Sequence, residues 1–227
     1  MYLIYGKKLP SLFVAIFIIQ SLFVSEILGY LLDGDSIEKA YAADTCAANP
    51  TVVVNNLQPS VMIGESVDFD IIFSNPAGGS DGYGPFIDMI LPAGADGDDG
   101  LSFTSASFLG TSLTTTVING PVGGGLVDHP YAVDNTNTPL QVTLAEGEEL
   151  VVFQLPFGSF VQDQTALVVN VSTAMSNLAD ASTPLDIQTR GGFQYGCDAL
   201  DNPSSDPSDT SGSFDPSSVT PVVFEMA

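Results

Sequence analysis

Apolar and polar residues alternate along most of the chain between Thr51 and Arg190. Val67, Phe69, Ile71 and Phe73 share one parity, with Asp68 and Asp70 between them, and Ile87, Met89 and Leu91 flank Asp88 in the same way. The same period of two recurs at Val52–Val54, Leu101–Phe103, Leu140–Leu144, Val151–Leu155 and Leu167–Val171. This period is typical of β-strands that bury one face.

Turn-forming residues interrupt each apolar run before it reaches helical length. The clusters are Asn75–Gly79, Pro92–Gly94, Asn119–Pro121, Gly123–Gly125 and Glu146–Gly147. Short strands separated by such turns predict an all-β fold, an antiparallel sandwich of about seven to nine strands. The stretch from Asn119 to Pro139 has little pattern and is expected to be a long loop.

Three segments resemble, in order and spacing, the "conserved repeat" domain of bacterial and archaeal surface proteins, domain-of-unknown-function family eleven. They are Gly64–Asn75, Asp88–Gly94 with the strand after Leu101, and Leu144–Phe153. The resemblance covers about residues 50–177 and implies an immunoglobulin-like sandwich with no catalytic residues. The acidic insert at Asp96–Gly100, the loop near His129 and the two cysteines depart from the family pattern.

The two ends of the chain differ from its middle. Lys7 and Lys8 precede the apolar run 12–24, and Ala40-Tyr41-Ala42 has the form of a signal-peptidase site. Residues 1–42 are therefore predicted to be a signal peptide or an uncleaved N-terminal anchor. The sandwich is assigned to residues 43–200. A Pro/Ser/Asp-rich linker is predicted at 201–218, and the start of a further domain at 219–227.

Charge narrows the range of partners. The 227-residue chain has a formal net charge of −23, and beyond the leader Arg190 is its only basic residue. Such a polyanion repels phosphate backbones and anionic membranes, which argues against nucleic-acid partners and against membrane binding beyond the leader. Without lysine after the leader, the domain cannot form a Lys–Asn isopeptide bond. Arg190 is expected to pair with a nearby carboxylate.

Cys46 and Cys197 are the only cysteines and bracket the predicted sandwich. In an exported protein this even count favours a disulfide, and two free thiols are the alternative. A bridge across so long a loop would contribute about 4–5 kcal/mol in the chain-entropy description.

The densest group of carboxylates is Asp96, Asp98 and Asp99. Ca²⁺ takes six to eight oxygen ligands, so Asp88 or backbone carbonyls would have to complete a calcium site there. The spacing does not match an EF-hand loop. An ordinary solvated acidic loop is the competing interpretation.

His129, the only histidine, precedes Pro130 in a Gly-rich stretch and is interpreted as a surface turn. Its neighbour Asp128 would face another direction, so the sequence predicts no Ser-His-Asp arrangement. The acids are expected on outward strand faces and loops, and the chain has no Trp, which argues against glycoside hydrolysis.

The sequence thus predicts a non-enzymatic spacer module in a larger exported, adhesin-like surface or secreted protein. Its expected partners are other domains of the same polypeptide. The alternative is a calcium-dependent module that binds a surface glycan or a protein.

Overall fold

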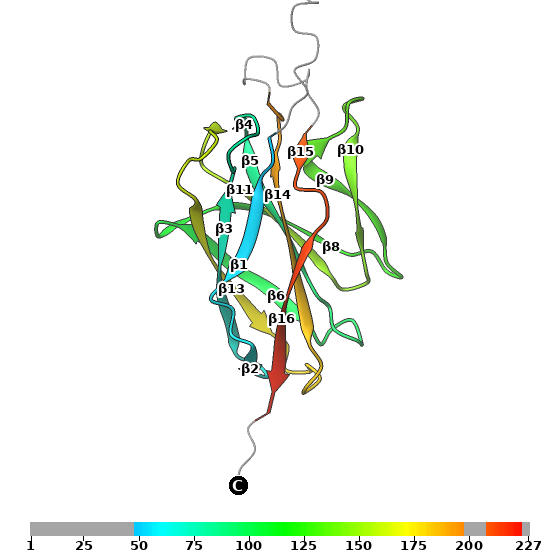
Figure 1. The fold of residues 1–227 in the computed structure, drawn as a ribbon. Helices are drawn as coiled ribbons and strands as arrows, with labels where there is room; N and C mark the ends of the chain where they lie inside the picture. Colours follow the sequence, from blue (N-terminus) through cyan, green and yellow to red (C-terminus); the bar gives the residue numbers. More distant parts are fainter. Residues whose placement is uncertain (1–47, 198–207, 224–227) are drawn as a thin grey trace, which may run out of the picture. The chain divides into compact units, whose positions relative to one another are not determined.

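The computed structural model describes residues 48–197 and 208–223, which form part of one compact unit, residues 46–227. The expected leader, residues 1–42, lies outside the described residues. The described residues fold into an immunoglobulin-like β-sandwich (Figure 1). The alternation predicted the sandwich, and the family resemblance implied its immunoglobulin-like form. The described residues form sixteen strands, many of them short, where about seven to nine were expected. Within these two ranges the chain has no helix, and so none that could cross a membrane.

The first sheet has the strand order β1-β3-β13-β6-β7. Its strands are Thr51–Asn55 (β1), Ser66–Ser74 (β3), Leu167–Met175 (β13), Leu101–Phe108 (β6) and Thr111–Ser112 (β7). The second sheet has the order β2-β16-β14-β5-β11-β8, with β15 beside β14. Its strands are Ser60–Met62 (β2), Asp215–Val222 (β16), Leu185–Phe193 (β14), Pro85–Leu91 (β5), Glu149–Gln154 (β11), Thr114–Asn119 (β8) and Asp209–Thr210 (β15).

One hairpin and one short pair of strands from distant parts of the chain complete the fold. Gly125–Val133 (β9) pairs with Pro139–Leu144 (β10), and Gly82–Tyr83 (β4) pairs with Ser159–Phe160 (β12). The expectation of a long loop is therefore wrong for residues 125–133, which form a nine-residue strand.

The main core lies between the two sheets and contains most of the residues that the alternation assigned to inward faces; the run Leu140–Leu144 belongs instead to a second cluster. Ile71, Phe73, Ile87, Met89 and Phe153 are all fully buried in the main core. Each such side chain contributes roughly 1.5–3 kcal/mol by leaving water.

A second apolar cluster lies on the other face of the second sheet, beneath the β9–β10 hairpin. It consists of Phe86, Ile90, Ala132, Val142, Leu144, Leu150 and Val152. Strand β5 is consequently buried at all seven positions, because its two faces contribute to two different cores. The domain therefore has three layers where it was expected to have two.

The C-terminal segment belongs to the same sandwich. Strand β16 pairs antiparallel with β14 over five residue pairs and parallel with β2 over three. Val219 is fully buried in the main core. The expected linker at 201–218 and separate domain from 219 are therefore wrong for residues 209–222; residues 198–207 and 224–227 lie outside the described ranges.

The first and last described strands reach opposite ends of the sandwich (Figure 1). A Cβ on Gly191 would lie 2.9 Å from Val52, so β1 begins beside the end of β14. The end of β16 lies past Leu185, the first residue of β14, which pairs with Val219. Gly191 and Leu185 are six residues apart along β14, and β16 continues three residues past Val219 to Val222, so about nine residues of extended strand, or about 30 Å, separate the two ends.

Candidate functional site

Three charged or titratable side chains meet between the second sheet and the β9–β10 hairpin. Asp88 lies at the centre of β5, and Arg190 lies directly opposite it on β14. The Asp88 Oδ2 atom accepts hydrogen bonds from Arg190 Nε at 3.0 Å and Nη2 at 2.5 Å. His129 of β9 contacts Asp88 Oδ1 through Nε2 at 2.7 Å. Both oxygens of a fully buried carboxylate are thus engaged.

Hydrogen bonding assigns the proton of the His129 ring. Nδ1 accepts the backbone N–H of Ala132 at 2.6 Å and that of Tyr131 at 3.1 Å. A nitrogen that accepts carries no proton, so the neutral ring carries its proton on Nε2 and donates it to Asp88. His129 therefore joins the hairpin backbone to the second sheet.

The Phe86 ring occupies the space beside His129, with ring centroids 5.0 Å apart. Phe86 fits because β14 has no side chain at Gly192, where a Cβ would lie 2.1 Å from the ring. The glycine therefore leaves room for an aromatic ring beside the charged cluster.

Phe214, the residue immediately before β16, covers the guanidinium group of Arg190. Its ring centroid lies 4.4 Å from the guanidinium carbon. A cation over an aromatic face contributes about 0.5–2 kcal/mol, depending on its exposure. The cluster of Asp88, His129, Arg190 and Phe214 thus connects β5, β9, β14 and the segment before β16.

This arrangement corrects two sequence-based expectations. His129 is 3% exposed and forms part of a core, whereas a surface turn was expected. Asp88 is fully buried, whereas the acids were expected on outward faces. The expectation that Arg190 pairs with a carboxylate is confirmed, and Asp128 is exposed and hydrogen-bonds to Gln141, away from the ring.

The hydrogen bonds of the cluster support a structural role. No serine, threonine or cysteine side chain contacts His129 among the hydrogen bonds of the described residues, and both oxygens of Asp88 already accept hydrogen bonds. A nucleophile and a position for a reacting atom are both required for triad chemistry. The cluster instead satisfies buried polar groups, as a stable interior requires.

The acidic loop carries the remaining predicted site residues. Asp99 is 3% exposed, and its Oδ1 atom accepts the backbone N–H of Asp96 at 3.1 Å, whereas the Asp96 and Asp98 side chains are exposed. The part of the chain that the structure describes brings no three His, Cys, Asp or Glu side chains together as a metal-binding group. Because Asp88 is engaged by Arg190 and His129, it is not available to this loop. Calcium binding at Asp96, Asp98 and Asp99 stays a prediction.

Cys197 lies at the edge of the main core. Its expected partner Cys46 lies outside the described residues, so the bridge also stays a prediction.

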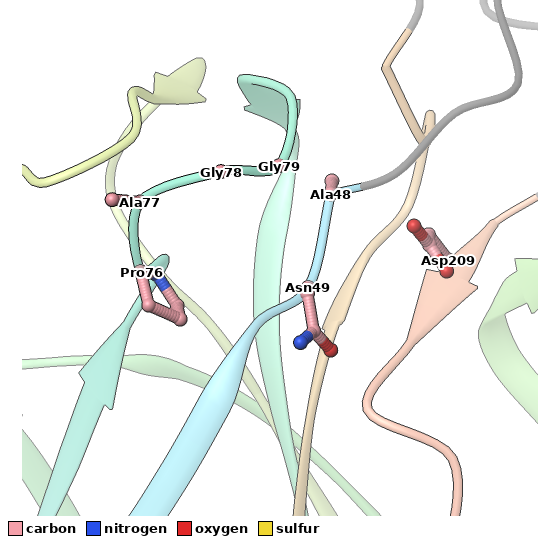
Figure 2. Close-up of a pocket in the computed structure, with 7 residues that line it drawn as sticks. All are labelled: Ala48, Asn49, Pro76, Ala77, Gly78, Gly79 and Asp209. Atoms are coloured by element: carbon pink, nitrogen blue, oxygen red, sulfur yellow. The ribbon is translucent and has the colours of Figure 1, made fainter.

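A hollow of about 400 Å³ lies at the end of the sandwich where β1 begins (Figure 2). It is lined by Ala48, Asn49, Pro76–Gly79 and Asp209. Burial raises the pKa of Asp209, and a backbone hydrogen bond with Thr210 partly opposes this shift. Among the described residues that line it, Asp209 contributes a carboxylate and Asn49 an amide.

Comparisons with known proteins give no family. No protein-family model and no curated protein matches the chain, so the resemblance to the conserved-repeat family stays a prediction. Solved structures with some similarity include AvmM, which catalyses macrocyclization in alchivemycin A biosynthesis, at 13% identity and a TM-score of 0.43 over 79% of this chain and 92% of that one.

Two further structures come from other kinds of protein. The seventh ScaB type I cohesin from Pseudobacteroides cellulosolvens has 11% identity and a TM-score of 0.39 over 78% of this chain and 95% of its own. A C-terminal fragment of the major pilin of Streptococcus agalactiae has 13% identity and a TM-score of 0.37 over 76% and 55%. Similarity this low says nothing about what the present chain binds, and no family is assigned.

Proposed function

We propose that this chain is a non-enzymatic structural module of an exported surface or secreted protein, a spacer that transmits tension along its length. The observation that supports this proposal is the placement of the first and last strands at opposite ends of the sandwich. Further domains of the same polypeptide are its proposed neighbours, and the leader predicted at residues 1–42 is the reason to propose export.

The direction of the terminal strands determines how tension would act on them. Pulling on the two ends draws β1 and β16 along their own axes in opposite directions. Five residue pairs join β1 to β3, five join β16 to β14 and three join β16 to β2. Force along a strand loads all of these hydrogen bonds together, whereas force across its end breaks them one after another.

The buried cluster supports the same proposal. It joins the hairpin to the second sheet through hydrogen bonds to one buried carboxylate, and Arg190 in turn contacts Phe214 in the segment before β16. Separating these elements would expose a buried carboxylate without its partners, which is costly.

Single-molecule pulling of residues 46–227 in two geometries tests the proposal. Attachment at the two ends loads β16 in shear. Attachment at residues 182 and 223 loads the same strand from its end, since Ser182 N–H donates to Pro221 O at 2.9 Å. We expect a clearly higher unfolding force in the first geometry. Equal forces would contradict the spacer function.

The calcium-dependent binding module remains the second hypothesis, and thermal unfolding in EDTA and in about 1 mM Ca²⁺ tests it. A site with a dissociation constant near 10 μM would add about 2.7 kcal/mol and raise the midpoint by several degrees. If the shift were absent, or unchanged in Asp98→Ala and Asp99→Ala, the hypothesis would be wrong.

A further inference from the structure

Strand β8 forms one edge of the second sheet. It pairs antiparallel with β11 over six residue pairs, and no other strand of the described residues pairs with it. Gly120 continues this ladder, because its N–H donates to the carbonyl oxygen of Glu148, the residue opposite it, at 2.7 Å. Hydrogen-bonded positions alternate along an antiparallel ladder, so the N–H and C=O groups of Thr115, Val117 and Asn119 point away from β11.

The outward side of β8 is open to another chain. The strand reads Thr-Thr-Thr-Val-Ile-Asn, with no charge, proline or glycine, and Val117 is 44% exposed. The edge strands β7 and β2 differ, because they have only two and three residues. A longer, uncharged edge is a template for strand addition, in which main-chain hydrogen bonds provide affinity.

Acidic residues gather at the Asn119 end of this edge. Asn119 pairs with Glu149 of β11, and the turn just before Glu149 carries Glu146 and Glu148. All three glutamates therefore lie within a few residues of the end of β8, on the strand and the turn beside it.

The acidic loop adds to this negative charge. A Cβ on Gly147 would lie 2.2 Å from the carbonyl oxygen of Gly97, so the Asp96–Asp99 loop lies against the same turn. Over residues 48–197 and 208–223 the only Lys or Arg is Arg190, which is paired with Asp88. The charge at this end of β8 therefore favours a partner that brings Lys or Arg to it, and it disfavours a second copy of this acidic chain.

The opposite end of β8 is apolar. Thr114 and its partner Gln154 line a hollow of about 520 Å³ together with Phe108, Leu113 and Leu155. Six residues of antiparallel strand extend over about 20 Å. A single extended peptide can therefore reach both the acidic end and the hollow.

We propose that β8 binds an extended segment of another protein, with Lys or Arg at its N-terminal end, β-branched residues in its middle and an apolar residue at its C-terminal end. The segment pairs antiparallel with β8, as β11 does on the other side. Its basic residues lie beside the glutamates at Asn119, and its last side chain enters the hollow at Thr114. This binding surface is independent of the spacer function, because a spacer with no ligand and a binding domain that bears no tension are both physically possible.

Fluorescence polarisation of a labelled peptide with residues 46–227 tests the proposal. The probe is Arg-Lys-Thr-Val-Thr-Val-Thr-Leu, with both ends blocked so that terminal charges do not contribute. Its first Val lies opposite Val117 when its Lys lies opposite Asn119. We expect saturable binding of one peptide per chain at concentrations up to about 1 mM, because one added strand forms a small, weak interface. Binding should weaken as salt is added.

Two control peptides test the charge and the direction of the segment. The same eight residues in reversed order should bind clearly more weakly, because the basic end then lies at the hollow if the segment pairs antiparallel. A peptide with two glutamates in place of Arg-Lys should also bind clearly more weakly, because it repels the acidic end of β8. Equal binding of either control peptide would overturn the proposal.

Variants of the domain test the strand edge itself. Val117→Pro removes one outward N–H without breaking a hydrogen bond to β11, and it should lower the affinity about tenfold. Val117→Thr keeps this N–H and is the matched control, with an affinity close to that of the wild type. Circular dichroism shows whether both variants fold.

A pair of charge variants keeps the test decisive if Val117→Pro does not fold. Glu146→Gln/Glu148→Gln should weaken binding of the basic peptide. Asp163→Asn/Asp186→Asn removes the same charge at two exposed positions outside β8 and its neighbour β11, and it should weaken binding much less.

Four results would overturn the proposal. They are no saturable binding at about 1 mM, an unchanged affinity in folded Val117→Pro, equal losses in the two charge variants, and a dimer that forms without peptide and is lost in Val117→Pro. The second and third results would reduce the contact to unspecific charge attraction, and the last would assign the edge to a second copy.

Discussion

Replacing Arg190 with methionine is expected to destabilise the domain more than the loss of a surface ion pair would. Arg190 donates to Asp88 through two nitrogens, and the Asp88 carboxylate is fully buried. Removing one partner of a buried pair leaves an uncompensated charge and costs about 3–5 kcal/mol. The remaining His129 hydrogen bond places the expected cost toward the lower end of that range, and the lost contact with Phe214 adds to it.

Two further variants distinguish an unpaired charge from a simple loss of packing. Asp88→Asn removes the negative charge, so the Asp88→Asn/Arg190→Met double variant should be more stable than Arg190→Met alone. Arg190→Lys keeps the positive charge but cannot donate from two nitrogens of one planar group, so its stability should lie between wild type and Arg190→Met.

Urea unfolding followed by far-ultraviolet circular dichroism measures these free energies, and an unchanged m-value shows that the unfolding transition itself is the same. A typical domain has about 5–15 kcal/mol of stability, so the expected loss is readily measured. A loss below about 1 kcal/mol for Arg190→Met would refute the reasoning, because that is the range of exposed pairs. Additive losses in the double variant would refute it as well.

Three further predictions concern the rest of the domain. Truncation after Ser213 should lower the urea midpoint strongly, because it removes β16 and the buried Val219, whereas truncation after Val223 should not. Reduction of oxidised protein should cost about 4–5 kcal/mol if Cys46 and Cys197 are bridged, and an unchanged midpoint in dithiothreitol would argue for free thiols. The pKa of Asp209 should exceed the ordinary 3.8 in a carbon-detected NMR titration. A pKa that is raised in the folded state stabilises the fold at pH values below the unfolded-state pKa. This contribution is lost as the pH rises through the folded-state pKa, so the stability of Asp209→Asn should lack this part of the pH dependence.

The alternation of apolar residues was sufficient to predict the strands that face the main core. It was less informative for β5, where Ile87, Met89 and Leu91 gave a regular pattern while Phe86 and Ile90 occupied the positions between them. A continuous apolar run, Pro85–Leu91, is typical of a strand covered on both faces, and it was the available signal for a third layer. What covers that second face could not be read from β9, where only His129 and Ala132 are buried.

The buried cluster was only partly predictable. Arg190 is the sole cation beyond the leader, and Asp88 interrupts an apolar run, so pairing these two residues was within reach of the sequence. The part played by His129 was not, because it depends on the hairpin folding back over the sheet. The C-terminal strand was missed for a different reason: β16 exposes Asp215, Pro216 and Ser218, so its composition resembles that of a linker although Val219 and Pro221 are buried.

The length released when the reduced domain unfolds under tension, pulled from its two ends, tests most directly whether it is a single mechanical unit. We predict one step that releases about 175 residues, or roughly 550–600 Å at about 3.5 Å per residue less the folded span. Two or more steps, with β16 or the β9–β10 hairpin detaching first at low force, would contradict a spacer whose layers are connected through Asp88.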